Sequence, residues 1–239
     1  MLRVPMEAKR DYNGLFYIDN DYFKQYPLYF DNYIEKNERS SFYELISTSD
    51  YIIKCGRKLN RKKVINMLLK FKEYQEYIKK TDFPIGYYEE DNIIKGLIIP
   101  YYNSPSLLNI KRTHDLGELS KFYYHDDNSI HNLYLLCLDI IDIIEEMYCN
   151  EIYYTDIHDG NFVFKDNNVK LIDFDPNLVF FSDNKKRENY NYMMYWCENI
   201  IYTLTKYFNL EDLAYRKINS FDKMRTYVKK IENRVTKNR

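Results

Sequence analysis

The most constraining feature of this sequence is the stretch from residue 152 to residue 176. A polar loop there leads into two short apolar runs and then into a second acidic cluster. The loop reads Asp-Ile-His-Asp-Gly-Asn, with Asp156 at its start and Asn161 at its end. The apolar runs, 162–164 and 169–172, are separated by turn-forming residues, so they predict a β-hairpin.

The second acidic cluster begins where the predicted hairpin ends, with Asp173 and Asp175. Because paired strands bring their ends together, we expect these two residues to lie near Asp156 and Asn161. Three carboxylates and an amide in one place repel each other unless a cation lies among them. Oxygen ligands favour Mg²⁺, which keeps several waters and takes phosphate oxygens for the rest of its shell.

The residue types, their spacing and the intervening hairpin resemble the catalytic loop and metal-binding segment of the protein-kinase-like superfamily. The form Asp-x-His-x-x-Asn, with His158 after Asp156, is most similar to the aminoglycoside and choline phosphotransferase branch. The alternative is an ordinary acidic hairpin on an unrelated fold. The resemblance implies an α+β, bilobal fold: an antiparallel-sheet N-lobe with one helix (1–102), and a small, mostly helical C-lobe (103–239).

The resemblance also implies roles for the residues around the hairpin in moving the γ-phosphate of ATP. Asp156 would accept the proton of the substrate hydroxyl or orient that hydroxyl. Asn161 and Asp173 would hold Mg²⁺, and Asp175 would hold a second ion or position Asn161. His158 takes the place of the kinase catalytic-loop lysine, or it only braces the loop; we favour the bracing role.

A lysine in a buried strand is the expected phosphate clamp of the N-lobe. Lys54 lies in Tyr-Ile-Ile-Lys-Cys, where an ammonium requires an anionic partner. By resemblance it contacts the α- and β-phosphates and pairs with a Glu of the following helix. We prefer Glu73 to Glu76, because Glu73 continues an apolar stripe between Leu69 and Tyr77. The alternative is that the lysine and both glutamates are exposed.

The stretch 96–103, which reads Gly-Leu-Ile-Ile-Pro-Tyr-Tyr-Asn, resembles the strand that runs into the hinge of the family, where backbone groups hold adenine. Ile99 would lie at the back of the adenine pocket, with Tyr101 and Tyr102 in the hinge. Pro100 has no N–H, so a neighbour must supply the hinge donor. A plain core strand that ends in a loop is an equal alternative.

Several positions depart from the family pattern. No Gly-x-Gly-x-x-Gly precedes the strand lysine, and Ser40 and Ser41 are the candidate phosphate donors in its place. Tyr154 and Thr155 stand where the family has His and Arg. Asp175 replaces the usual Gly, which again favours the small-molecule branch.

Local patterns predict the remaining elements. The stretch 15–18 is ambiguous between a strand and a short helix. Expected strands are 28–33, 42–46 and 51–55, followed by a hairpin of 85–88 and 93–100. Expected helices are 60–80, 116–123, 130–149, with a buried apolar stripe, 190–208, and one or two within 209–239.

The composition of the chain limits the kinds of partner and compartment that we expect for it. A formal net charge of −1 over 239 residues gives no global attraction to nucleic acid or to an anionic membrane, so neither is expected as a partner. The four cysteines are scattered, which favours a reduced, cytoplasmic protein. The first ten residues lack the apolar core of a signal peptide, so we expect none, and no apolar run in the sequence is long enough to cross a bilayer.

The sequence therefore predicts an ATP- and Mg²⁺-dependent phosphotransferase that acts on a hydroxyl. The short stretch after Asp173 leaves little chain for a small-molecule pocket and favours a Ser or Thr of a protein acceptor. The loop sequence favours a small acceptor such as an aminoglycoside or choline. A pseudokinase that binds partners without chemistry is the third hypothesis, supported by the missing glycine loop.

Overall fold

The structure is a computed structural model. It describes residues 5–6, 8–19, 21, 41–45, 48–56, 59–78, 80–181, 186–208 and 219–237, with the backbone alone at 41, 42, 44, 186, 187 and 234–237. The chain divides into two compact units. The first unit comprises Met1–Tyr102 with Asp173–Asn177, and the second comprises Asn103–Ile172 with Leu178–Arg239. Asp173–Asn177 thus belongs to the first unit, although it lies far along the chain from the rest of that unit.

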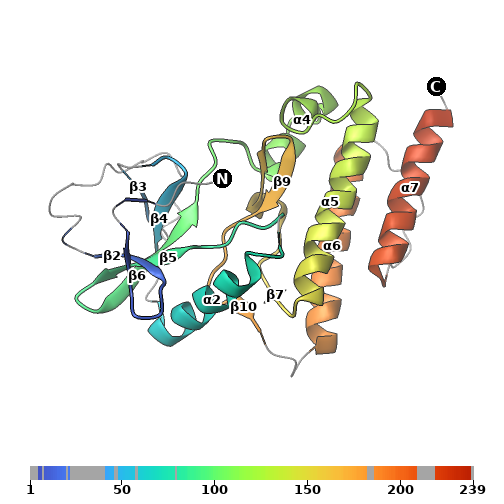
Figure 1. The fold of residues 1–239 in the computed structure, drawn as a ribbon. Coiled ribbons are helices and arrows are strands. Elements are labelled where there is room, and N and C mark those ends of the chain that lie inside the picture. Colours follow the sequence, from blue (N-terminus) through green and yellow to red (C-terminus); the bar gives the residue numbers. More distant parts are fainter. Residues whose placement is uncertain are drawn as a thin grey trace. The chain divides into compact units, whose positions relative to one another are not determined.

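A six-stranded sheet forms the first unit, in the order β1-β2-β5-β6-β4-β3 (Figure 1). Its strands are β1 (Lys9–Arg10), β2 (Phe16–Asp19), β3 (Ser41–Glu44), β4 (Tyr51–Cys55), β5 (Gly86–Glu90) and β6 (Ile93–Pro100). The expected hairpin of β5 and β6 is confirmed, and Asp91 and Asn92 at its turn have positive φ angles of 50° and 62°. The predicted strand 28–33 lies outside the described residues.

One strand pair departs from the antiparallel sheet that we expected. β2 runs parallel to β5, with Phe16 opposite Gly86, while the other pairs of the sheet are antiparallel. The ambiguous stretch 15–18 thus supplies a strand that lies beside β5, far along the chain. Apolar side chains of β2, β4, β5 and β6 meet in one cluster with Leu45, which directly follows β3: Ile18, Leu45, Tyr51, Ile53, Tyr88 and Ile98.

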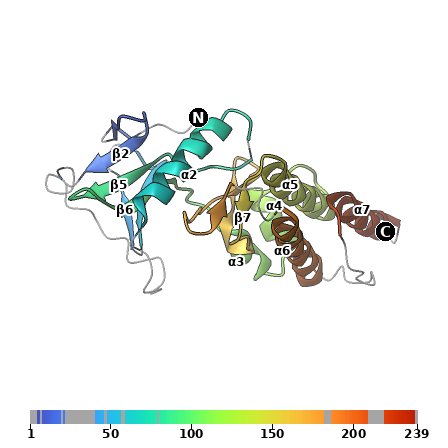
Figure 2. The same cartoon turned by 90° about the horizontal axis from the view of Figure 1, so that it is seen from below.

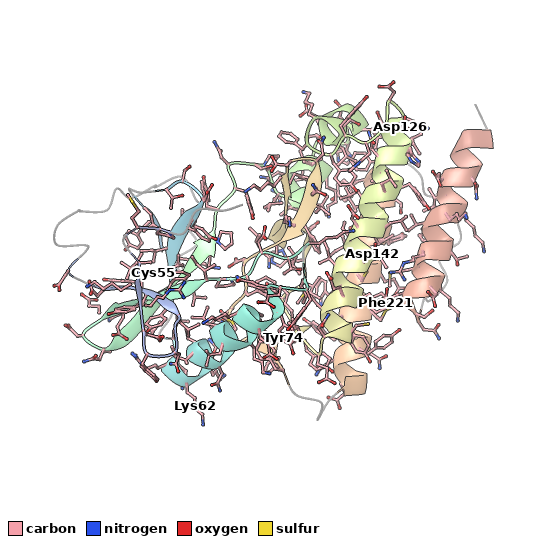
Figure 3. All side chains as sticks on the ribbon, in the orientation of Figure 1. Cys55, Lys62, Tyr74, Asp126, Asp142 and Phe221 are labelled. Atoms are coloured by element: carbon pink, nitrogen blue, oxygen red, sulfur yellow. The ribbon has the colours of Figure 1, made fainter. Side chains whose placement is uncertain are left out.

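The helix of the first unit, α2 (Arg61–Tyr74), begins at an N-cap where the Asn60 side chain accepts from the Lys63 N–H. It runs along the sheet (Figure 2), and Arg61 lies 5.8 Å from the ring of Tyr87 on β5. Its buried residues are Val64, Met67, Leu68 and Phe71. The helix ends before the predicted residue 80, and Figure 3 labels Tyr74 at its end.

The second unit is mostly helical. Its helices are α3 (Leu107–Lys111), α4 (Leu116–Phe122), α5 (Ser129–Cys149), α6 (Lys186–Tyr207) and α7 (Phe221–Lys237). The predicted stripe of α5 is buried, and α5 packs against α4, α6 and α7. Arg225 of α7 donates to Asp142 of α5 at 2.7 Å; Figure 3 labels Asp142 on α5. Among the described residues, every helix is too short or too polar to cross a bilayer.

Short strands and one 3-10 turn complete the second unit: β7 (Tyr153–Tyr154), η1 (Asp159–Asn161), β8 (Phe162–Lys165), β9 (Asn168–Leu171) and β10 (Val179–Phe180). The predicted hairpin is confirmed as β8 and β9, with Phe162 opposite Leu171. Its turn is Asp166-Asn167, where φ is 49° and 59°. The α+β class is therefore confirmed.

Candidate functional site

The expected site residues fall on both units, and each unit is described by itself. Lys54, Glu73, Ile99, Tyr101, Tyr102, Asp173 and Asp175 belong to the first unit, and Asp156, His158 and Asn161 belong to the second. Ser40 lies outside the described residues. Ser41 is described only by its backbone, which pairs with Cys55 at the start of β3.

An ion pair joins the expected phosphate clamp to the expected metal segment. Lys54 of β4 donates from Nζ to Asp173 Oδ1, although 119 residues separate the two in sequence. The side chains are 23% and 31% exposed, so both charged ends are partly desolvated yet reachable from solvent. The anionic partner that the setting of Lys54 required is therefore Asp173.

Packing fixes the segment that carries Asp173. Phe174 is buried against two rings of the first unit, with ring centroids 5.2 Å from Phe71 and 5.1 Å from Phe83. Asp173 itself has a φ of 67°, a left-handed conformation that few residues other than glycine adopt. Asp175 Oδ1 accepts from the Asn177 N–H at 2.7 Å and so closes the turn that follows.

The expected pair of Lys54 with Glu73 is wrong. Glu73 is exposed and pairs with Lys70 one turn earlier, with 3.2 Å between Nζ and Oε2. Leu69 and Tyr77, which suggested an inward-facing stripe, are also exposed, because α2 buries the face that carries Met67 and Phe71. Glu76, the other candidate, is exposed too.

The end of β6 has the buried character that a pocket wall requires. Ile99 is buried and lies opposite Ile52 of β4. The Tyr101 N–H donates to Asp50 O at 2.9 Å, so a nucleotide would have to compete for it. Tyr102 donates its hydroxyl to Asp82, and burial, together with this carboxylate, raises the pKa of Tyr102, which keeps the phenol protonated.

The loop of the second unit orients the amide of Asn161. This side chain is 5% exposed, and its Nδ2 donates to Tyr154 OH at 2.7 Å and to the Asp156 backbone carbonyl at 3.0 Å. A carbonyl only accepts, so the nitrogen of the amide must face it. The two N–H groups are thereby used, and within the described chain no group donates to Oδ1. The loop thus presents Oδ1 as an acceptor beside Asp156.

His158 takes a bracing position in the same loop. Its Nδ1 accepts from the Gly160 N–H at 3.0 Å, which caps η1. In this bond the imidazole acts as an acceptor through Nδ1 and holds the turn in place. Nε2 lies 4.0 Å from Asp156 Oδ1, beyond hydrogen-bond distance.

Three further contacts hold the loop, and none of them was predicted from the sequence. Tyr154, noted only as a departure from the family pattern, is buried and accepts from Asn161. Tyr192 of α6 donates to the Thr155 carbonyl at 2.7 Å. Lys111 of α3 pairs with Asp159 inside η1. The only local sign of this ion pair is that Lys111 and Asp159 are charged, since the two residues are remote from each other in sequence.

The residues expected to hold Mg²⁺ carry oxygen atoms in each unit taken by itself: the carboxylates of Asp173 and Asp175 in the first, and the open Oδ1 of Asn161 in the second. Carboxylate and amide oxygens are the ligands that Mg²⁺ prefers. Within the described ranges, no three His, Cys, Asp or Glu side chains gather as a metal site. The side chains present therefore have the ligand chemistry that Mg²⁺ requires.

Comparison with solved structures finds similarity in fold. No protein-family model matches the sequence, and no curated protein matches it. Among solved structures, the chain is similar to a rhoptry kinase from Toxoplasma gondii, with a TM-score of 0.49 and 11% sequence identity. The match covers 72% of this chain and 60% of that kinase, so the chain spans less than two thirds of its length.

Proposed function

We propose that this protein is an ATP- and Mg²⁺-dependent phosphotransferase that moves the γ-phosphate to a hydroxyl, with a Ser or Thr of a protein as the leading acceptor. The observation that carries the proposal is the ion pair of Lys54 and Asp173. Phosphoryl transfer needs a cation for the phosphates and a carboxylate for the metal in one place. The fold of the first unit brings these two groups together from distant parts of the chain.

The first unit would bind the nucleotide. Lys54 would neutralise phosphate charge, and Ile99 would offer the apolar surface that an adenine ring needs. Asp173 would supply carboxylate oxygens to Mg²⁺, which withdraws charge from the phosphates when it is bound. The partial exposure of the ion pair leaves both groups accessible to a ligand from solvent.

The second unit would supply the groups that act on the acceptor. The Asp156 side chain is 45% exposed, so it is open to a hydroxyl from outside and would accept its proton or orient it. Asn161 would present Oδ1 to the metal, because its two N–H groups are already used. His158 would keep the loop in shape through its bond to the Gly160 N–H, so its role in the proposal is bracing.

A small-molecule acceptor is the second candidate. It is favoured by the Asp-x-His-x-x-Asn loop and by Asp175, which stands where protein kinases have Gly. A binding module without chemistry is the third, since no Gly-x-Gly-x-x-Gly precedes Lys54. The site residues Lys54, Asp156, Asn161 and Asp173 argue against it, because binding alone gives no reason to keep the proton acceptor.

An acceptor screen that measures ADP release separates these candidates. The wild-type chain is incubated with ATP and Mg²⁺, and either casein-like proteins or a panel of aminoglycosides, choline and sugar alcohols is added. Stimulation by the proteins alone supports the leading acceptor, and stimulation by one small alcohol alone replaces it. Nucleotide binding without ADP release under any condition would favour the binding module. The variant Asp156→Ala removes the proposed proton acceptor and should abolish ADP release. Its matched control is Asp127→Ala, which removes an exposed carboxylate of the second unit and should not change ADP release.

A further inference from the structure

Lys111 is a buried lysine of the second unit that the chemistry proposed above does not use. It is the last residue of α3 and is 7% exposed. Its Nζ pairs with Asp159 Oδ2, lies 3.5 Å from Thr203 Oγ1 and stands 4.9 Å from the centre of the Tyr207 ring. One ammonium therefore connects α3, η1 and α6.

The position of its partner gives this ion pair its significance. Asp159 stands between His158, which caps the turn, and Asn161, whose amide is oriented by the loop. Its side chain is 16% exposed. A buried carboxylate that lost its cation would be left with an uncompensated charge and would move toward solvent. Such a movement would carry the neighbouring residues of the 3-10 turn with it.

We propose that Lys111 and Asp159 are positioning residues that set the geometry of the loop 156–161 for phosphoryl transfer. The inference rests on the proposed function. Lys111 is too buried to touch a substrate, so it acts through the loop. The ion pair fixes η1 from behind, and η1 in turn presents Asn161 Oδ1 and holds the backbone next to Asp156. Displacements of about 1 Å at reacting groups cost rates on the order of a hundredfold.

The test uses the full chain with both charges removed together, as Lys111→Met with Asp159→Asn. This double variant leaves no unpaired buried charge, so it should fold. We expect kcat to fall roughly tenfold to a hundredfold, with little change in KM for ATP, while the Mg²⁺ concentration for half-maximal rate rises. The single variant Lys111→Arg keeps a cation beside Asp159 and should therefore retain most of the wild-type kcat. Lys121→Met breaks an exposed ion pair with Glu118 and should change none of these values.

Hydrogen exchange decides the positioning role without any turnover. The amides to follow are Gly160, which donates to His158 Nδ1, and Asn161 and Ile172, which donate to the carbonyls of His158 and Asn161. In the double variant these amides should exchange at least tenfold faster, while the Ile152 amide, bonded to Met147 O, keeps its protection.

Each outcome is decisive. Unchanged exchange at the three loop amides, or wild-type kcat in the double variant, overturns the positioning role. A wild-type chain that releases no ADP with any acceptor overturns the phosphotransferase, and the exchange measurement then still decides whether the ion pair holds the loop. Faster exchange and a lower kcat in the double variant, with a kcat near wild type in Lys111→Arg, support both the positioning role and the phosphotransferase.

Discussion

The amide of Asn161 is oriented by its neighbours so that its oxygen remains available as an acceptor. Both of its N–H groups are used inside the second unit, by Tyr154 OH and by the Asp156 carbonyl. A buried amide gains most when each polar atom has a partner, and here the atom left open is the oxygen. The orientation of Oδ1 therefore depends on the hydroxyl of Tyr154.

Tyr154→Phe should destabilise the protein, because it leaves a buried N–H of Asn161 without its acceptor. Loss of such a partner lowers the free energy of unfolding by about 1–3 kcal/mol, which is measured as a lower urea midpoint. Tyr195→Phe is the control, since that ring lies on α6 and is 57% exposed. Equal midpoints for Tyr154→Phe and the wild type would show that this hydrogen bond contributes nothing.

Asp156→Ala should remove turnover and leave nucleotide binding intact. If the carboxylate acts as general base, the rate should fall roughly a hundredfold or more. ADP release and ATP-dependent thermal stabilisation are measured on the same preparation. An unchanged rate would mean that the loop has been assigned the wrong chemistry.

Residue roles were predictable where the sequence itself holds the partners close together. Asp156 and Asn161 share one loop, and their contact follows from spacing. The exposure of Glu73 could not be predicted, because two overlapping stripes of α2 have the same helical period and only packing decides which of them is buried. Lys111 and Asp159 lie 48 positions apart, so no local pattern could pair them.

At the scale of elements, the sheet of the first unit contains a pairing that local patterns could not reveal. β4, β6, α5 and the β8–β9 hairpin have strong periodicity and turn residues, and they were predicted. β2 lies parallel to β5 at the end of a stretch without clear periodicity. Its register depends on Gly86, where the backbone of Phe16 approaches closely.

Gly86→Ala should loosen β2 from β5. A Cβ at this position would lie 2.1 Å from the Phe16 carbonyl oxygen, which is backbone and cannot rotate away. Overpacking of this kind costs about 1–3 kcal/mol, measured by urea unfolding. Gly117→Ala is the matched control, because there the new Cβ meets the exposed side chain of Asp115. Undiminished stability of Gly86→Ala would mean that the parallel pairing is not as described.

At the scale of the whole molecule, buried thiols predict a loss of stability at alkaline pH. Burial raises the pKa of Cys137 from 9.0 to about 12, and burial raises the pKa of Cys55 to about 12 as well. The unfolded chain therefore binds fewer protons than the native chain between about pH 9 and about pH 12. The stabilisation is complete below pH 9 and is lost as the pH rises through this window.

The free energy of unfolding should therefore fall above about pH 9, by at most about 1.4 kcal/mol per pH unit for each such group. Urea midpoints from about pH 8 to about pH 11 measure it. Cys137→Ala should make the decline shallower. A decline with the same slope in Cys137→Ala would contradict the buried, protonated state of this thiol.

Thermal unfolding with ATP, with and without Mg²⁺, tests the central claim most directly. A ligand at a hundred times its Kd stabilises by about 2.7 kcal/mol, a shift of several degrees in Tm. The account predicts that ATP with Mg²⁺ raises Tm well beyond ATP alone, and that Asp173→Asn abolishes the Mg²⁺-dependent part while Asp127→Asn keeps it. A Tm that ATP and Mg²⁺ leave unchanged, or an undiminished Mg²⁺ effect in Asp173→Asn, would contradict the account.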